Sequence, residues 1–255
     1  MTISVAIYAP TPEHHDMALN LSKKLSLPLV RNQTLEFRYL LFFSQQGLAL
    51  KQTGGNSPGP IRVDFTAGSL QFRLRHGGGR RQALARAIGL KKGWHPRVID
   101  ATGGLGRDAF ILAHLGCHVE MIERTPILAA LLADGLERGA IADLTSEITR
   151  NRLYLTWADS RERLLKLKQE ELPDVIYLDP MYPERTKSSK VKKEMRILRE
   201  VAGDDKDAPE LLEISLKRAR NRVVVKRPRL APTLNDILPS HEISGKTSRF
   251  DVYLI

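Results

Sequence analysis

The segment "VIDATGGLGRDAF", residues 98–110, joins an apolar strand to a helix through a turn that holds three glycines. The strand ends at the carboxylate of Asp100, and Gly104 and Gly106 precede the helix. Glycine adopts positive φ without steric cost, so backbone N–H groups at a helix N-terminus can approach a ligand closely. The pattern predicts a βα turn that binds a nucleotide-type cofactor, although a tight turn without a ligand would use the same glycines.

Strand-like and helix-like segments alternate on the C-terminal side of residue 96. The segments typical of strands are residues 97–101, 118–123, 153–159, 174–179 and 221–228. The segments typical of helices are residues 106–116, 125–139, 160–170, 191–202 and 209–220. This order predicts an α/β, Rossmann-like fold with a mostly parallel sheet and helices on both faces. The last two strand-like segments, 241–245 and 249–255, are expected to pair antiparallel and close the sheet.

The first 75 residues show shorter and more mixed signals, which predict a small α/β unit. The expected elements are, in chain order, a strand (3–9), a helix (12–27), two strands around a turn (37–52) and two further strands with a period of two (61–65 and 69–75). Residues 76–95, a glycine-rich linker and a basic helix, are expected to join this unit to a second domain over 96–255.

The composition indicates a folded and strongly basic chain. Hydrophobic residues make up 42% of it, a globular proportion. There are 40 Lys and Arg residues against 29 Asp and Glu, a net charge of +11. This charge favours a polyanion partner, although a protein that is merely basic would show the same balance. Cys117 is the only cysteine, so no intrachain disulfide can form, and the chain suits a reducing compartment.

Other sequence signals argue against a membrane or metal protein. No apolar run approaches the ~18 residues of a membrane helix, and the N-terminal segment lacks the basic n-region of a signal peptide. The seven histidines show no ligand spacing. We therefore expect a cytoplasmic protein without a metal site.

Acidic residues follow the next two predicted strands at positions that suit the same cofactor. Glu123 lies 123 − 104 = 19 residues after Gly104, close to the ~20 typical of an acid that binds ribose hydroxyls. Asp159 follows the third strand, where it could accept from an adenine amino group. The turn reads G-G-x-G rather than the dinucleotide motif G-x-G-x-x-G, and Asp108 suits a cationic or zwitterionic ligand better than a pyrophosphate. S-adenosylmethionine (SAM) has these properties.

The fourth strand and the loop after it form "DVIYLDPMYPER", residues 174–185, which suggests a site for an amine substrate. Exocyclic amines of nucleobases are poor nucleophiles, and the carboxylate of Asp179 together with a backbone carbonyl near Pro180 could orient one toward a methyl donor. Tyr182 could stack on a base that has left its helix. A capping acid with an aromatic side chain packed against it is the alternative interpretation.

The segment "DPMYP" resembles the (D/N)-P-P-(Y/F/W) signature of methyltransferases that act on exocyclic amines, with Met181 in place of the second proline. Together with "DATGGLGRDAF", "IERTPILAALLADGL", "VVVKRP" and "GKTSRFDVYL", it makes the chain similar to the bacterial small-subunit ribosomal RNA methyltransferase J family. The similarity is clear over residues 76–255 and looser before them. It implies the SAM-dependent methyltransferase fold, methylation of N2 of a guanine near the 3′ end of 16S RNA, and S-adenosylhomocysteine as the product.

The same resemblance assigns residues to the site. It implies SAM contacts at Arg107, Asp108, Glu123, Arg124, Asp159, Ser160 and Asp179, beside the turn residues Asp100, Thr102, Gly104 and Gly106. Thr102 stands where many SAM enzymes have a glycine. The expected partner is small-subunit ribosomal RNA or the small subunit. The basic residues near the site that could contact its phosphates are Lys187, Lys190, Lys192, Lys193, Lys226, Arg227 and Arg229. A solvated basic face is the alternative for any one of them.

Two other functions remain open from the sequence. The signature alone does not separate guanine N2 from adenine N6 or cytosine N4, in RNA or DNA. A SAM-binding RNA chaperone or scaffold without turnover would also carry these patterns. Naked RNA, a partly assembled subunit and the finished subunit are all compatible with the sequence as substrates.

Overall fold

The computed structural model describes residues 4–33, 35–54, 59–76, 79–181, 191–245 and 248–255 of the chain. It contains a seven-stranded sheet in the order β10-β11-β9-β8-β5-β6-β7 and a four-stranded sheet in the order β2-β1-β3-β4. The strands of the larger sheet are β5 (Arg97–Asp100), β6 (His118–Glu123), β7 (Leu153–Trp157), β8 (Val175–Leu178), β9 (Arg222–Pro228), β10 (His241–Ser244) and β11 (Ser248–Leu254).

The larger sheet has the predicted Rossmann-like architecture. Strands β7, β6, β5, β8 and β9 run parallel to one another, and β11 and β10 are added antiparallel at the β9 edge. The chain runs outward from β5 through β6 to β7 and then returns to form β8 on the other side of β5. The strand order therefore reverses between β5 and β8. In such sheets ligands bind beyond the carboxyl ends of the strands at this point.

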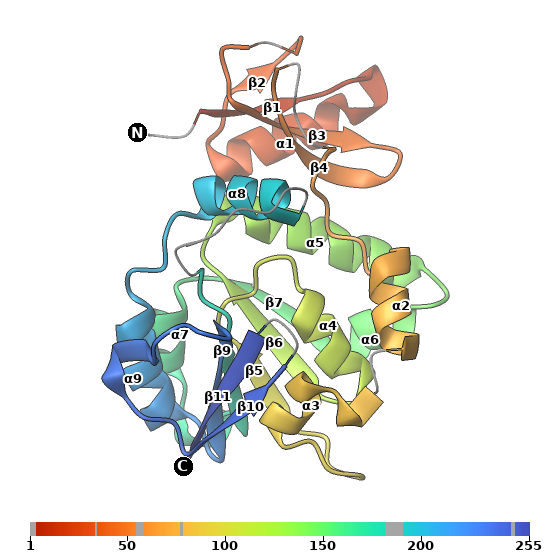
Figure 1. Cartoon of the computed structure of the whole chain (residues 1–255). Coiled ribbons are helices and arrows are strands. Elements are labelled where there is room, and N and C mark those ends of the chain that lie inside the picture. The colour runs from red at the N-terminus through yellow and green to blue at the C-terminus, as the bar shows by residue number, and fades with distance from the viewer. Residues whose placement is uncertain (1–3, 34, 55–58, 77–78, 182–190, 246–247) are drawn as a thin grey trace.

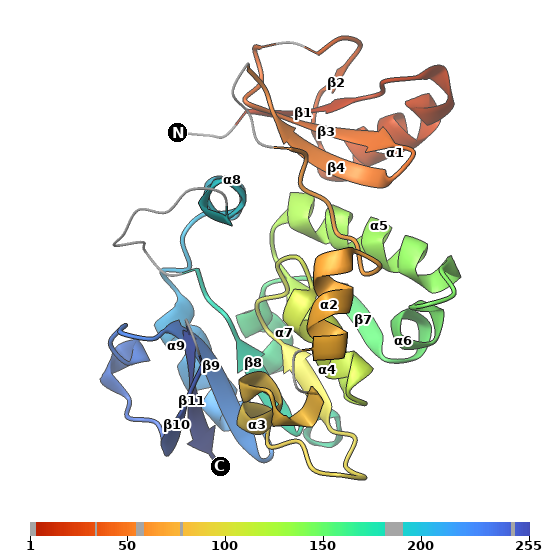
Figure 2. The same cartoon turned by 45° about the vertical axis from the view of Figure 1, so that its right-hand side comes forward.

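Helices cover both faces of the larger sheet (Figures 1 and 2). Alternate strand residues point to opposite faces, so Val98 and Tyr177 pack in one core while Ile99 and Ile176 pack in the other. The first face is covered by α2 (Gly68–His76), α3 (Ala83–Ile88), α4 (Arg107–His114), α5 (Pro126–Ile141) and α6 (Ser146–Asn151). The second face is covered by α7 (Ser160–Lys166) and α9 (Ala208–Arg218).

The N-terminal residues form the smaller sheet with one helix packed on it. Its elements are β1 (Val5–Tyr8), α1 (His15–Leu25), β2 (Leu29–Val30), β3 (Tyr39–Ser44) and β4 (Gly47–Gln52). The apolar core of this unit is continuous with the core around α4 and α5. Helix α8 (Val191–Ala202) also contacts the unit, because the hydroxyl of Tyr39 donates to Glu200 and Arg38 lies 2.6 Å from the same carboxylate. The unit therefore supports the helix that follows the segment 182–190.

Two segments before residue 76 differ from the prediction. Residues 69–75 were expected to form a strand but belong to α2. Leu70 and Leu74 lie four residues apart and pack into the core, which is the spacing of one side of a helix. The run is short and also alternates apolar and polar residues, which is why it resembled a strand. Residues 61–65 keep the alternating burial of a strand, yet only Ile61 pairs, in a single bridge with Leu50. Phe65 instead stacks on Phe110 of α4 with ring centroids 4.8 Å apart, so this segment packs against a helix of the larger sheet.

Candidate active site

A cavity of about 700 Å³ lies beyond the carboxyl ends of the parallel strands, with residues of α8 and of the α8–α9 connection on its far side. This volume is typical of a small-molecule site. The residues predicted from the sequence for cofactor binding all line it, as does Pro180: Asp100, Thr102, Gly104, Gly106, Arg107, Asp108, Glu123, Arg124, Asp159, Ser160 and Asp179. The structure thus brings together side chains that come from four different strand ends.

The glycine turn fits a closely bound ligand. Gly106 is the N-cap of α4 with φ 70°, and a Cβ atom there would lie 2.9 Å from Leu132 and 3.1 Å from Met121. Gly104 also has positive φ, 54°, but a Cβ on it would meet only the carbonyl of Thr102, at 3.7 Å. Gly106 therefore allows the turn to pack against α5 and β6, whereas Gly104 leaves room on the cavity wall.

Glu123 connects the end of β6 to this turn. Its Oε2 accepts from the backbone N–H of Gly104 at 2.8 Å, and its Oε1 accepts from the N–H of Thr125 at 2.7 Å. Burial raises the pKa of Glu123, while these two backbone hydrogen bonds act in the opposite direction. Each carboxylate oxygen retains a second lone pair, so the group can still accept from a ligand hydroxyl.

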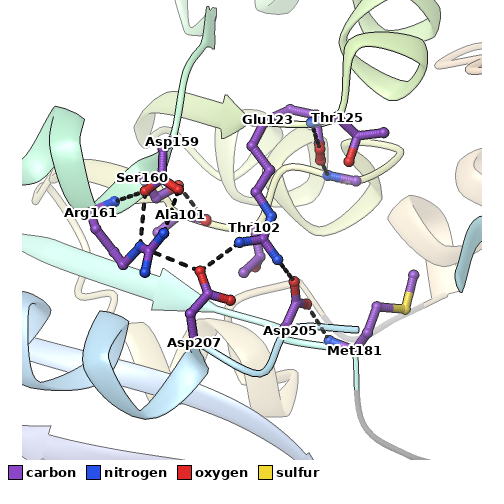
Figure 3. Close-up of polar contacts among 12 residues, drawn as sticks. Ala101, Thr102, Glu123, Thr125, Asp159, Ser160, Arg161, Met181, Asp205 and Asp207 are labelled. Atoms are coloured by element: carbon purple, nitrogen blue, oxygen red, sulfur yellow. Dashed lines mark hydrogen bonds and ion pairs between the residues drawn. The ribbon is translucent and has the colours of Figure 1, made fainter. Parts of the chain in front are cut away.

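Asp159 and Ser160 mainly stabilise the start of α7. Asp159 caps this helix by accepting from the N–H of Arg161 at 2.9 Å and also forms an ion pair with the guanidinium of Arg161. The buried hydroxyl of Ser160 donates to the carbonyl of Ala101 at 2.7 Å. Both contacts appear in Figure 3. They fix the β7 end of the site relative to the glycine turn.

Two aspartates of the α8–α9 connection, which were not predicted from the sequence, belong to the site. Arg124 forms ion pairs with Asp205 and Asp207, each with an N–O distance of 2.5 Å. Asp205 also accepts from the backbone N–H of Met181 at 2.7 Å (Figure 3). Asp205 therefore links the β6 end to the backbone just after Asp179. The signal in the sequence was the acidic run "DDKD", residues 204–207, which is unusual in so basic a chain.

Thr102 connects the two strand ends at which the strand order reverses. Its hydroxyl accepts from the backbone N–H of Asp179 at 2.6 Å and lies 3.3 Å from Oδ1 of Asp100. Burial raises the pKa of Asp100 to about 7, and the charges of Asp108 and Asp179 add to this effect. A glycine at position 102, as in many SAM enzymes, could not make these hydroxyl contacts.

Lys226, at the end of β9, joins two carboxylates at the base of the site. Its Nζ lies 2.8 Å from Oδ2 of Asp108 and 2.7 Å from Oδ2 of Asp179. Asp108 also accepts from the hydroxyl of Tyr177 at 2.8 Å and from Arg73 at 2.7 Å. Burial acts to raise the pKa of Asp108, but Lys226 and Arg73 together lower it to about 2. This carboxylate is therefore ionised at neutral pH.

The residues expected to contact RNA phosphates are not on one exposed face. Lys226 is held by the two carboxylates and Arg227 is buried, whereas Arg229 is exposed. Three predicted residues lie outside the described residues: the stacking residue Tyr182, and the lysines Lys187 and Lys190. The side chains of Lys192 and Lys193 lie outside them as well. Lys226 thus lies inside the predicted cofactor site rather than on the outer surface.

The part of the chain that the structure describes offers no candidate for a metal site or a membrane-spanning helix. No group of three or more His, Cys, Asp or Glu residues there could hold a metal ion. No helix in these ranges is long and apolar enough to cross a membrane.

Comparison with known proteins identifies the family. A family model described as "putative SAM-dependent methyltransferase" matches residues 20–255. The ribosomal RNA small subunit methyltransferase J of Coxiella burnetii is 48% identical over 255 residues, which is all of this chain and 98% of that protein. The corresponding protein of Thioalkalivibrio sulfidiphilus is 49% identical over 251 residues, 98% of this chain and 97% of its own. The chain belongs to the ribosomal RNA small subunit methyltransferase J family.

A solved member of the wider group has the same fold. The crystal structure of a SAM-dependent methyltransferase from Neisseria gonorrhoeae is 34% identical, covers 98% of this chain and 95% of its own, and gives a TM-score of 0.77. This member of the methyltransferase J family is therefore a SAM-dependent methyltransferase with a Rossmann-like fold, as the sequence predicted.

The residues of the cavity fit SAM. The open wall at Gly104 and the lone pairs left on Glu123 would suit a ligand with ribose hydroxyls. When bound, SAM supplies an electrophilic methyl group on a positively charged sulfur. The carboxylates that line the cavity would stabilise that charge.

Proposed function

We propose that this methyltransferase J family member transfers the methyl group of SAM to the exocyclic N2 of one guanine in small-subunit ribosomal RNA. The names of its relatives support ribosomal RNA as the substrate class. The choice of the amine rests on the resemblance of "DPMYP" to the signature of exocyclic-amine methyltransferases.

The position of Asp179 carries the proposal. The residue follows β8 directly, lines the cavity and keeps 40% of its side chain exposed. Lys226 contacts Oδ2, and no hydrogen bond to Oδ1 is made within the described ranges. Oδ1 is thus available to accept a hydrogen bond from an amine that enters from solvent.

The chain would favour the reaction by orienting this amine. The lone pair of an aromatic amine is delocalised, and hydrogen bonds from both amine hydrogens to Asp179 and to a nearby carbonyl would hold the nitrogen in line with the methyl carbon. The nitrogen then forms a bond to that carbon while the carbon–sulfur bond breaks and its electron pair stays on sulfur. The negative charge of Asp179 stabilises the positive charge that develops on nitrogen, and the extra proton leaves to water afterwards.

The decisive assay uses substrate that lacks the modification. Ribosomal RNA and small subunits are purified from cells that lack this protein and are incubated with the enzyme and SAM labelled in the methyl group. We expect label in a single N2-methylguanosine, located by nuclease mapping. Label in methyladenosine or methylcytidine would contradict the choice of guanine N2, and label in neither substrate would contradict ribosomal RNA. Comparing the free RNA with the subunit shows which of them is the substrate.

A further inference from the structure

A long stretch of the chain that leads from the smaller sheet into β5 contains cations but no acids. From residue 65 to residue 99 there are eight Arg and Lys residues and no Asp or Glu. In contrast, the cations around the cavity, such as Arg124 and Arg161, are paired with carboxylates. The acid-free stretch covers α2, the 3-10 helix η2 (Gly79–Arg81) and α3.

The charges of α2 and η2 lie on the surface. Arg75 and His76 at the end of α2, and Arg80 and Arg81 in η2, are all exposed. The two elements are in contact, so these side chains belong to one area, which we call the α2–η2 surface. In the parts of the chain with described coordinates, no carboxylate forms an ion pair with Arg75, Arg80 or Arg81, so their charges are not compensated locally.

An exposed aromatic pair lies beside these cations. Phe72 keeps 64% of its surface exposed, and its ring stacks on the ring of His76 with centroids 4.4 Å apart. The residues are four apart on α2, so both rings lie on one side of the helix. Exposed rings next to unpaired arginines are the combination that binds single-stranded nucleic acid, by stacking on bases and by phosphate contacts.

The α2–η2 surface is directly connected to the active site. Arg73, on the same helix, lines the cavity and lies 2.7 Å from Asp108, while 39% of its side chain is exposed. Figures 1 and 2 show α2 on the outer side of α4, the helix that begins at the glycine turn. A polyanion bound along α2 would thus reach the edge of the cavity.

We propose that the α2–η2 surface binds the phosphate backbone of the substrate RNA next to the target base. This inference rests on the proposed function, and it assigns RNA contacts to residues outside the segments 187–193 and 226–229 that the sequence suggested. Each phosphate neutralised by an arginine releases counterions, so binding weakens with salt by a slope of roughly 0.7–0.9 per contact.

The test compares two variants with the same change in net charge. Arg75→Gln/Arg80→Gln/Arg81→Gln removes the cations of the surface. Lys24→Gln/Lys166→Gln/Lys217→Gln removes three exposed lysines that do not line the cavity. Affinity for protein-free small-subunit ribosomal RNA is measured over a range of salt concentrations, together with methyl transfer to the substrate and affinity for S-adenosylhomocysteine.

We expect the arginine variant to bind RNA at least tenfold more weakly at physiological salt and to lower the salt slope by roughly 2 to 3. Its affinity for S-adenosylhomocysteine should stay within twofold of the wild type, and the lysine variant should bind RNA with the wild-type slope. Replacing the three arginines by lysine should restore the slope, because the charge returns.

Equal RNA affinity and slope in the arginine variant and the wild type would overturn the inference. So would a loss of binding confined to assembled subunits, because the surface would then contact a ribosomal protein. A wild-type enzyme that binds RNA but transfers no methyl group to it or to the subunit would instead contradict the proposed function, so the two failures are distinguishable.

Discussion

Lys226 and Asp179 form an ion pair across the ends of β9 and β8, with Nζ of the lysine 2.7 Å from Oδ2 of the aspartate. The same Nζ lies 2.8 Å from Oδ2 of Asp108, in the first turn of α4. One cation therefore holds the carboxylate proposed to bind the amine and a second carboxylate at the cofactor turn. We infer that Lys226 positions Asp179 so that only its other oxygen faces the substrate.

Replacing Lys226 by methionine should lower the rate of methyl transfer about 10- to 100-fold, because Asp179 loses the contact that orients it. Loss of the cation should also raise the pKa values of Asp108 and Asp179, since the charge of Lys226 lowers both. Single-turnover rates measured against pH should then begin to fall at a higher pH than in the wild type as the solution is acidified. An acidic limb at the wild-type position would argue against this role, and Lys226→Arg should restore part of the rate.

Gly106→Ala should destabilise the protein more than Gly104→Ala. Both glycines have positive φ, which costs an alanine about 1–2 kcal/mol. Only at position 106 would the methyl group also collide, with Leu132 and Met121, which adds about 1–3 kcal/mol. Urea unfolding of the two variants separates the cost of positive φ from the cost of the collision. Equal losses of unfolding free energy would show that α5 and β6 yield to the added methyl group.

Asp100 should make the free energy of unfolding depend on pH. Its pKa is about 7 in the folded protein and near 3.8 when unfolded, so between these values the folded state retains a proton that the unfolded state has lost. Raising the pH through this window therefore destabilises the protein, by up to about 4 kcal/mol at pH 7 and above. Asp100→Asn, which cannot ionise, is the control. The wild type should lose stability relative to it from pH 4 to 7, and a constant difference would contradict the raised pKa.

Glu200 should affect the use of RNA without affecting SAM. Its carboxylate accepts from Tyr39 and pairs with Arg38, which attaches α8 to the N-terminal unit. Helix α8 follows residues 182–190, which contain Tyr182. Glu200→Ala should raise KM for the RNA substrate several-fold and cost about 1 kcal/mol of stability, with unchanged affinity for S-adenosylhomocysteine. Tyr39→Phe removes the same hydrogen bond from the other side and should have a similar, smaller effect. An unchanged KM in both variants would show that this attachment does not influence the substrate.

The sequence predicted the larger sheet and most of its helices, because their signals are strong and local. The strands β5, β6, β8 and β9 carry apolar runs that are buried on both faces, and each of β5 to β9 is followed by a carboxylate or a turn at the predicted position. Helix α2 was misread because its core-facing side consists of two leucines, Leu70 and Leu74, and a short run of this kind also alternates apolar and polar residues. Helix α6 has no long apolar stripe and was not predicted.

The sequence could predict only those site residues that lie at the end of a strand or in the turn after it. Local patterns do not encode how distant segments fold back over the sheet. That folding is what brings Asp205 and Asp207 into the site and points Lys226 inward. Lys226 was placed among the RNA contacts since it lies in the basic run "KRPR". Its neighbours Asp108 and Asp179 come from elements 118 and 47 residues away in the chain.

The most direct test of the account is the rate of methyl transfer by Asp179→Ala under single-turnover conditions, together with its affinity for S-adenosylhomocysteine. We expect the rate to fall at least about 100-fold, because the amine loses the acceptor that orients it, while the affinity changes by less than about tenfold. A variant that methylates the same guanine at a rate near that of the wild type would contradict the central claim that Asp179 orients the amine.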